Sequence, residues 1–554
     1  MKFLSFGILV LILNGVFYGP HHVHPYYGGS TAPVVIQDVT PVDTFIKLYI
    51  NQTDEAKAIK LKGNKVIVTK GLARLYKQLN YQPVWDNIKN RQDLVNILQA
   101  AYFEGLNPKD YHIDFIQDYN TTLTTVKKKN AMHKAMADIL MTDAILSYTH
   151  HLIHGKVHSE NLDLNWNYSK PCTPDDIEFK LLTRLTTQSL KPGIDSIRSD
   201  LPIYSKLKQL FAKYDSLHKA GGKLPEIRYP GKSLQKGDSI SEVGLLKQRL
   251  IADSYLLTLE DHLFDEELEL ALMDFQSLNG LKADGIAGKK TYKALNISLE
   301  DRLDILRVNM ERVRWLNNKS PDTYILVNIA SFNLQLIKQK QKKFQCKVVV
   351  GKQHHQTPVF TSSIKYVVFN PIWYIPKSII TNEILPLLKQ DSLYLPNRNM
   401  TLLQNAEVID PSTVDFSIYT TNNFPFSIRR EPGPDNDLGL VKFLFPNKYA
   451  VYLHDTPSKS LFSRTERAFS HGCIRVEKPF LLAQYLLGNQ GYNQDVIKEI
   501  LAKQETQTVY LNEEMPIMII YMTCHDNKDN NKISFYNDIY GLDEKLLHLL
   551  KKSK

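Results

Sequence analysis

Cysteine is scarce in this chain of 554 residues, which contains only Cys172, Cys346, Cys473 and Cys524. The four residues lie far apart and form no CxxC pair, which argues against both a disulfide framework and a structural zinc site. A cysteine that stays unpaired in an oxidising compartment needs a reason. Each of the four is therefore a candidate for reactive chemistry.

Clustered charge is also missing. The net charge of +10 is spread over the whole length, and the densest basic runs, at 127–129 and 338–343, are short and carry no interleaved aromatic residues. A nucleic-acid-binding domain would show a basic stripe on one face, so we expect no nucleic-acid partner. A mildly basic protein tolerates an anionic polymer as a partner.

Long hydrophobic runs are absent apart from one at the start of the chain. Lys2 is followed by FLSFGILVLIL, which is too short to span a bilayer comfortably and is typical of an export signal. The cleavage site is poor, so an uncleaved membrane anchor remains an alternative. No cysteine follows the run, which excludes a lipidated anchor. We expect a signal peptide or N-terminal anchor at 1–19 and a flexible spacer at 20–41.

The region 42–230 has the pattern of helices. Apolar residues recur at three- and four-residue spacing in 70–79, 91–106 and 131–155, and Gly105 and Gly155 have the positions of helix C-caps. The histidines between 150 and 158 have helical spacing too, but no acidic residue stands in register with them. The pattern therefore predicts a helical domain without a metal site.

A linker at 231–239 leads into a compact unit at 237–297. Two amphipathic helices are followed by the turn signals Asn279-Gly280 and Asp284-Gly285, and a short third helix begins near Thr291. The pattern predicts a small three-helix module.

Past residue 300 the sequence becomes rich in short β-like runs. One helix, at 299–316, precedes alternating strands that are separated by Pro, Gly and Asn turns, which favours a β-sandwich or an open barrel-like sheet. We expect this β-rich, sandwich-like domain at 300–525, with an insertion of mixed character at 377–425 that acts as a mobile cap or as structural decoration. A tail follows at 526–554. The fold class is thus multidomain α+β.

The clearest chemical signal is the segment HDTPSKSLFSRTERAFSHGCIRVEKP, at 454–479. A thiol nucleophile needs a base, a group that orients the base, and donors for the oxyanion. His454, at the end of a predicted strand, can act as the base for Cys473, and the carbonyl or the side chain of Asp455 can orient it. The amides of Gly472 and Cys473 are natural oxyanion donors.

Other interpretations of this segment remain open. Cys473 could be a buried structural thiol, or it could bind zinc together with His454 and either Asp455 or His471, although that spacing is not a familiar ligand set. The helix expected near Pro479 would lower the pKa of the thiol only modestly.

The segment resembles the active-site signature of YkuD-type L,D-transpeptidases: a histidine, a loop of roughly fifteen residues, and then Ser/Thr-His-Gly-Cys. The resemblance implies that Cys473 is the nucleophile and His454 its base, with the carbonyl of Asp455 as orienter. It also implies that His471 and Gly472 shape the pocket. Many members have Asn two residues after the cysteine, where this chain has Arg475, as does the large multidomain subgroup.

The resemblance extends beyond the motif. The blocks 351–360, 367–379 and 430–457 look like the catalytic domain of that subgroup, 240–297 resembles a peptidoglycan-binding type 1 module, and the segments 75–87 and 100–114 resemble its helical scaffold domain. The implied substrate-binding residues are Ser470, Arg475, Trp373, Tyr374 and Asn436. Arg475 could contact a substrate carboxylate or a structural acid.

The implied activity is transpeptidation of peptidoglycan. The thiolate attacks the carbonyl before the terminal D-alanine of a stem peptide, and the acyl-enzyme passes to an amine on a neighbouring stem, giving a 3→3 cross-link. The resemblance implies no cofactor or metal, a periplasmic location, glycan strands and stem peptides as partners, and acylation by carbapenems. The alternatives are a stem-peptide hydrolase, an enzyme that anchors protein to the wall, and an inactive wall-binding scaffold.

Overall fold

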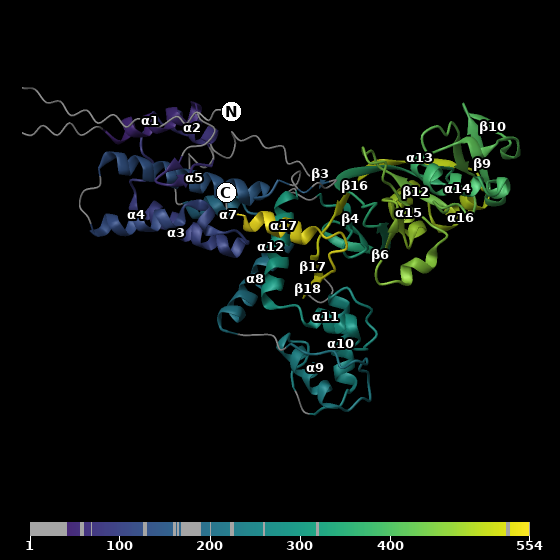
Figure 1. Ribbon diagram of the computed structural model, residues 1–554, viewed down its shortest axis with the longest axis horizontal. Helices are drawn as coiled ribbons and strands as arrows, with labels where there is room; N and C mark the ends of the chain where they lie inside the picture. The colour runs from purple at the N-terminus through teal and green to yellow at the C-terminus, as the bar shows by residue number, and fades with distance from the viewer. Residues whose placement is uncertain are drawn as a thin grey trace, which may run out of the picture.

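The computed structural model describes residues 41–55, 60–67, 69–125, 130–158, 162, 166–167, 190–199, 201–221, 226–258, 261–316, 321–527 and 532–552. The expected signal, the spacer as far as residue 40, and Cys172 lie outside these ranges. None of the helices in the described ranges is long and apolar enough to cross a membrane. The described residues form a helical lobe, a small projecting module and a β-rich lobe (Figure 1).

The helical lobe is built around α5 (Ala131–His154), which is buried along most of its length. Its other helices are α1 (Val42–Glu55), α2 (Thr69–Gln78), α3 (Ile88–Ala100), α4 (Ile113–Thr125), α7 (Leu190–Ile197) and α8 (Pro202–Lys219). A short hairpin joins β1 (Lys60–Leu61) to β2 (Asn64–Lys65), and the 3-10 helices η1 (Ala101–Glu104) and η2 (Pro108–Tyr111) follow α3. Gly105 has φ +72 at the end of η1, as expected of a C-cap glycine. The predicted helical domain is confirmed.

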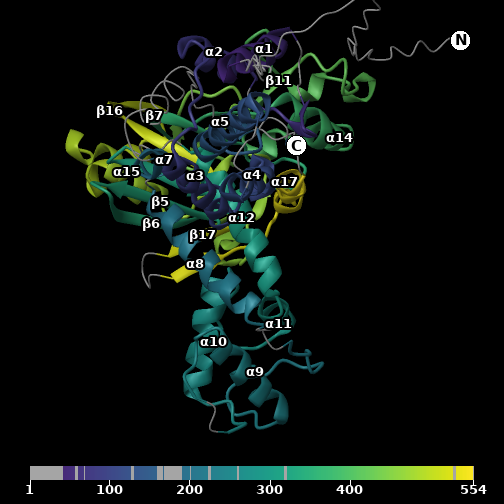
Figure 2. The same cartoon turned by 90° about the vertical axis from the view of Figure 1, so that its left-hand side faces the viewer.

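The module consists of α9 (Ser241–Ala252), α10 (Glu266–Leu278) and α11 (Lys289–Leu295), and it projects away from the other two lobes (Figure 2). Its apolar side chains form a core of their own that includes Leu246, Leu272 and Phe275. Helix α12 (Leu299–Trp315) continues from the module and packs against α8. The side chain of Arg302 on α12 reaches back to Asp253 at 2.8 Å, which fixes the module to this helix.

The β-rich lobe is a sheet that closes on itself. Its strands follow the order β12-β13-β15-β6-β5-β4-β16-β7, and β7 pairs again with β12. The bounds are β4 (Tyr324–Asn328), β5 (Asn333–Lys338), β6 (Gln341–Gly351), β7 (Val359–Phe369), β12 (Val441–Leu444), β13 (Leu453–His454), β15 (Ile474–Val476) and β16 (Gln507–Ile520). Two short strands, β3 (Trp166–Asn167) and β14 (Ala468–Ser470), add to β7 and β6, and α15 (Pro479–Leu487) and α16 (Gln494–Ala502) pack on the core. The predicted mixed α+β class is confirmed, and the alternating strands form one ring around a single core.

The insertion folds as a cap with its own core. A four-stranded sheet, β10-β9-β11-β8, contains β8 (Trp373–Tyr374), β9 (Met400–Gln404), β10 (Glu407–Ile409) and β11 (Ser427–Arg430). The helical elements α13 (Lys377–Ile379), η4 (Ile380–Ile384) and α14 (Leu385–Leu388) cover it, and η4 is a π-helical turn. The cap core reaches from Ile375 to Ile428. Paired strands thus extend the cap slightly beyond the expected limits of 377 and 425.

The expectation of a C-terminal tail is wrong. A hairpin of β17 (Cys524–Asn527) and β18 (Lys532–Phe535) is followed by α17 (Leu542–Lys551), whose Leu542, Leu546 and Leu550 belong to the core of the β-rich lobe. The apolar residues recur every four positions, which is the spacing of a helix that buries one face. This part of the chain therefore completes the core of the β-rich lobe.

Candidate active site

Two neighbouring strands position the candidate base and nucleophile: His454 ends β13, and Cys473 directly precedes β15. Strand β13 pairs in parallel with β15, with Leu453 opposite Ile474 and His454 opposite Arg475. Leu453 and Ile474 are fully buried in the core of the ring. Because side chains alternate along a strand, His454 and Cys473 belong to the opposite face and are diagonal neighbours there. Folding therefore brings both residues of the motif to one surface.

The imidazole of His454 is held by the backbone. Its Nδ1 lies 2.5 Å from the carbonyl oxygen of Asp455. Since a carbonyl can only accept, Nδ1 carries the proton of the neutral ring and Nε2 is the basic nitrogen. Burial, and then the positive charge of Arg475, lower the pKa of His454 to about 3, against the opposing effect of the carbonyls of Asp455 and Leu438. The ring is thus neutral at physiological pH.

Of the two groups that could orient the ring, the carbonyl of Asp455 makes the contact. The carboxylate of Asp455 has other partners: one oxygen accepts from the Lys459 ammonium, and the other accepts from the amide of Leu440 at 3.0 Å. These bonds fix the turn that places the carbonyl under the imidazole. The side chain therefore supports the site through the backbone.

The thiol of Cys473 lies beside Tyr452 and Ala450. Its Sγ donates to the carbonyl of Ala450 at 3.8 Å, and it also interacts with the amide and the hydroxyl of Tyr452. Within the part of the chain that the structure describes, it makes no hydrogen bond to His454. Burial raises the pKa of the Cys473 thiol, against the lowering effects of Tyr452 and Arg475. Burial outweighs those effects, so the resting pair is a thiol and a neutral imidazole.

A tight turn presents the thiol. The hydroxyl of Ser470 donates to the carbonyl of Cys473 at 2.5 Å and accepts from the amide of Gly472 at 3.2 Å. Gly472 adopts a φ of +114, and its carbonyl accepts from the Thr357 hydroxyl at 2.8 Å. Ser470 is only 2% exposed, so its predicted contact with substrate is wrong and its role is to clasp the turn.

The turn also determines which amide can act on an oxyanion. The Gly472 amide already donates to Ser470, whereas the Cys473 amide makes no hydrogen bond to any residue in the described ranges. Cys473 is therefore the free donor in the resting state. The predicted part of Gly472 in an oxyanion hole requires its amide to leave the serine, and it remains a prediction.

His471 connects the turn to the cap. Its Nε2 lies 2.8 Å from Oε1 of Glu383, which belongs to the π-helical turn η4, and its ring lies 5.1 Å from that of His355. Such π-helical turns are found frequently at functional sites. This contact joins the loop to the cap two residues before the candidate nucleophile.

Arg475 is half-buried next to the thiol. Its Nε is buried without a hydrogen-bond partner, and the guanidinium forms no ion pair with any acid that the structure describes. Asp437 is close enough to favour the charged form, but its carboxylate bonds to Arg430 at 2.5 Å. Burial lowers the pKa of Arg475, although the group remains a cation at neutral pH. A buried cation without a bonded acid is suited to receive an anionic ligand.

Of the other expected cleft residues, Trp373 reaches the site region and Asn436 does not, whereas the contact of Tyr374 with substrate remains a prediction. The side chain of Trp373 interacts with Tyr452, and Tyr374 is 63% exposed. Asn436 is 1% exposed, and its amide holds the carbonyls of Pro371, Arg430 and Glu431 while its oxygen accepts from Leu438. The prediction that Asn436 binds substrate is wrong, because every polar atom of its side chain is already bonded.

The sequence reasoning missed Tyr452, whose hydroxyl lies between the thiol and Trp373. Alternation in the run YAVYLH was the available signal, since Tyr452 precedes His454 by two residues and therefore shares its face. No such signal existed for Glu383 or Thr357, which approach only through tertiary folding. In the described ranges, no three His, Cys, Asp or Glu side chains are arranged to hold a metal ion, including the set considered for zinc.

Comparisons with known families agree with this architecture. Residues 70–210 match a scaffold domain, residues 239–295 match a putative peptidoglycan binding domain, and residues 322–497 match the L,D-transpeptidase catalytic domain. These matches confirm the three resemblances drawn from the sequence. The catalytic-domain match includes both His454 and Cys473.

A putative L,D-transpeptidase of Haemophilus influenzae is 36% identical over 244 residues, which make up 44% of this chain and 48% of the relative. The chain thus matches about half the length of that curated relative. A solved L,D-transpeptidase of Stackebrandtia nassauensis is 14% identical and aligns with 52% of this chain and 94% of its own, at a TM-score of 0.22. An L,D-transpeptidase of Xylanimonas cellulosilytica is 13% identical and aligns with 53% of this chain and 100% of its own, at a TM-score of 0.18.

Proposed function

Because this chain carries an L,D-transpeptidase catalytic domain together with a peptidoglycan-binding domain and a scaffold domain, we propose that it cross-links peptidoglycan stem peptides through a Cys473 acyl-enzyme. The observation that carries the proposal is the placement of Cys473 and His454 on one face of two paired strands, with the imidazole fixed by the carbonyl of Asp455. Nucleophile, base and orienting group then have the roles that acyl transfer requires.

In the first half-reaction, Sγ of Cys473 attacks the carbonyl carbon before the terminal D-alanine of a donor stem. The thiol proton moves to Nε2 of His454, and the developing oxyanion accepts a hydrogen bond from the free amide of Cys473. Collapse of the tetrahedral intermediate breaks the peptide bond. The D-alanine leaves with the proton that His454 returns to its amine.

In the second half-reaction, the side-chain amine of a diamino acid on a neighbouring stem attacks the thioester. His454 accepts a proton from this amine, the carbon–sulfur bond breaks, and a 3→3 cross-link forms with the thiol restored. No step of this sequence calls for a cofactor. The identity of the diamino acid depends on the peptidoglycan strand that supplies the acceptor stem.

The low pKa of His454 suits a site that is activated by its substrate. A thiol with a raised pKa and an imidazole with a pKa of about 3 hold no separated charge in the resting state. Proton transfer becomes favourable only when negative charge develops on the substrate carbonyl and stabilises the imidazolium. A resting thiol is also protected from the oxidants of an extracytoplasmic compartment.

The cap and Arg475 supply the specificity of the proposed reaction. The C-terminal carboxylate of the donor stem binds the unpaired guanidinium of Arg475, while Trp373 and Tyr374 contact the stem. The contact between Glu383 and His471 holds the cap against the catalytic loop. A closed cap keeps water from the thioester until the amine arrives.

The proposed place of action is the periplasm, with export directed by the N-terminal apolar run, which is either cleaved or retained as an anchor. The peptidoglycan-binding domain keeps the enzyme on glycan strands and stem peptides. The same thiol is expected to react with carbapenems, whose strained carbonyl resembles the donor acyl group.

The direct test incubates the purified full-length chain with uncross-linked disaccharide-tetrapeptides and follows the products by mass spectrometry. We expect loss of D-alanine together with cross-linked dimers, and neither product with the Cys473→Ala variant. Release of D-alanine without dimers indicates the hydrolase, and attachment of a protein amine indicates the anchoring enzyme. Absence of any turnover supports the inactive wall-binding scaffold.

A further inference from the structure

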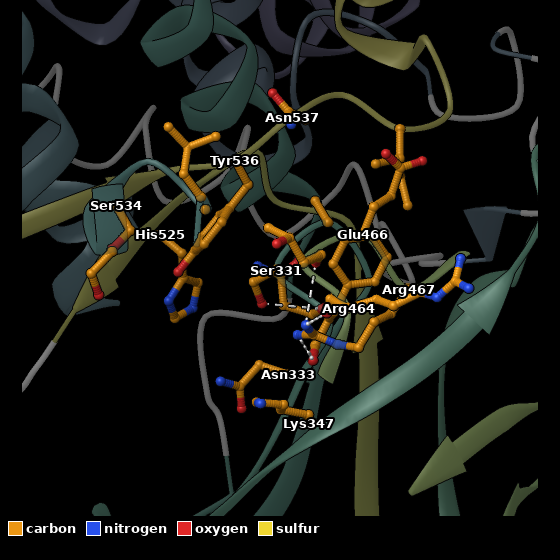
Figure 3. A pocket seen from close by; sticks show the side chains of 18 of the residues that line it. Ser331, Asn333, Lys347, Arg464, Glu466, Arg467, His525, Ser534, Tyr536 and Asn537 are labelled. Atoms are coloured by element: carbon orange, nitrogen blue, oxygen red, sulfur yellow. Dashed lines mark hydrogen bonds between the residues drawn. The ribbon is translucent and has the colours of Figure 1, made fainter. Parts of the chain in front are cut away.

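A cleft of about 490 Å³ lies between the peptidoglycan-binding domain and the catalytic sheet, away from Cys473. One wall comes from α10 and α11, the floor from β4, β5 and β6, and the remaining walls from the loop 463–467 and the C-terminal hairpin. Its volume is in the range of sites that bind small ligands, roughly 300–1,000 Å³. Figure 3 shows its side chains, with His525, Ser534 and Tyr536 on one side and Arg464, Glu466 and Arg467 on the other.

The floor of the cleft is a polar sheet face. Asn333 pairs with Lys347 and Gln335 with Gln345, while the alternate residues on β5 and β6 point into the core of the ring. Side-chain amides both donate and accept, so this face can bond to hydroxyl and amide groups. The Oδ1 of Asn333 is buried and has no hydrogen-bond partner in the described chain. A buried acceptor of this kind calls for a donor from a ligand.

The walls of the cleft are basic. Lys282 and Lys290 extend from the module, and Arg464 and Arg467 come from the opposite loop, whereas Glu466 is the one acidic residue among those that line the cleft. Arg467 is buried and donates to the carbonyls of Phe332, Val348, Arg464 and Thr465. Burial lowers the pKa of Arg467 to about 10, so it remains charged at neutral pH. The cleft therefore attracts anions.

Contacts between the two domains hold the cleft in shape. A Cβ on Gly280, at the end of α10, would lie 3.1 Å from the ring of Tyr536, which shows how closely the module meets the C-terminal hairpin. The loop that carries Arg464 and Arg467 runs directly into β14 and then into the turn that presents Cys473. A ligand in the cleft thus contacts the loop that leads, through β14, to the turn with Cys473.

We propose that this cleft is a second binding site, which takes an acidic strand rich in hydroxyl and amide groups, namely a glycan that bears peptide carboxylates. The identity of this ligand rests on the proposed function, whereas the cleft itself does not include the reactive pocket. Carboxylates bind Lys282, Lys290 and Arg464, and sugar hydroxyl and amide groups bind Asn333 and the neighbouring glutamines. The site holds one strand between the two domains while a stem reaches Cys473.

The test measures binding of soluble, uncross-linked disaccharide-tetrapeptide strands to the full-length Cys473→Ala protein by calorimetry at low and at physiological salt. The variant Lys282→Glu/Lys290→Glu reverses two charges of the cleft. The matched control, Lys289→Glu/Lys293→Glu, reverses two exposed lysines of α11 that do not line it. We expect Kd to rise about tenfold in the cleft variant and less than about twofold in the control. We also expect weak binding of a neutral N-acetylglucosamine tetrasaccharide.

Equal effects of the two variants, absence of strand binding, or equally tight binding of the neutral tetrasaccharide would overturn the proposal. The same two variants, made with Cys473 intact, are assayed on a soluble tetrapeptide. Loss of transfer in every protein, including the one without lysine changes, would contradict the proposed function and leave the binding result standing.

Discussion

The candidate active site and the interdomain cleft each contain an arginine, Arg475 half-buried and Arg467 buried, and the two arginines differ in their partners. Arg467 in the cleft donates to four backbone carbonyls, which fix the guanidinium in place. Arg475 in the pocket has a buried Nε without a partner in the described chain. Arg467 is therefore a fixed source of positive potential, whereas the guanidinium of Arg475 can bind an anionic ligand. The pocket is therefore built for chemistry on one group, and the cleft for holding a polymer.

The two regions also differ in how they use charge. In the pocket, burial keeps both His454 and Cys473 neutral at rest. In the cleft, the side chains of Lys282 and Lys290 are exposed to solvent. Substitutions in the pocket should consequently change turnover strongly, and substitutions in the cleft should change strand binding moderately.

The largest difference between the two regions is expected for Cys473→Ala. Removal of the nucleophile should lower acyl transfer by at least about 10³-fold, because the covalent route is lost. Strand binding should remain, since the cleft does not contain Cys473. Cys346→Ala, which changes a buried thiol in the core of the ring, is the control and should retain transfer.

A smaller effect is expected on stability in acid, through His454. The unfolded histidine takes up a proton near pH 6.5, whereas the folded one does so only near pH 3. Stability should therefore fall as the pH drops from 6.5 towards 3, because only the unfolded state binds the proton there. Between pH 7 and 5 this linkage corresponds to about 2 kcal/mol.

Urea unfolding at the two pH values measures this effect. The natural chain should lose about 2 kcal/mol more between pH 7 and 5 than His454→Gln, which has no proton to gain. Equal losses in the two proteins would show that the imidazole is not held neutral by burial.

Arg475→Gln should lower kcat/KM for a tetrapeptide donor by about tenfold, mainly through KM, because a charge-assisted hydrogen bond to the donor carboxylate is lost. A donor with a C-terminal amide is the matched substrate. The natural enzyme should discriminate against this amide, and Arg475→Gln should not. If Arg475→Gln still preferred the carboxylate donor over the amide donor, the guanidinium would not bind the donor carboxylate, and its role would be the alternative one, a contact with a structural acid.

Much of the architecture could be predicted from local sequence patterns. Three- and four-residue apolar spacing predicted α5 and the helices of the module, and the motif that contains His454 and Cys473 spans two strands that pair with each other. The periodic leucines of α17 were equally informative, although the region was predicted to be a tail.

Features that depend on distant partners could not be predicted. Asn436 was predicted to bind substrate, but its side-chain amide donates to three backbone carbonyls. Ser470 was predicted to do the same, but its hydroxyl bonds within the turn that presents Cys473. Ring closure rests on the pairing of β7 with β12, which are far apart in the chain. Lys290, Asn333, Arg464 and Tyr536 line the cleft and come from four separate segments of the chain. No local sequence pattern predicts that these residues lie together.

The central claim is that Cys473 forms a covalent bond to the donor stem. Rapid mixing of the enzyme with a tetrapeptide donor in the absence of an acceptor amine, followed by acid quench and mass spectrometry of the peptides, tests it most directly. We predict that the peptide containing Cys473, and no other peptide, gains the mass of the donor without its terminal D-alanine. D-alanine release with unmodified Cys473 at every time point, or the same adduct on Cys346 or Cys524, would contradict the account.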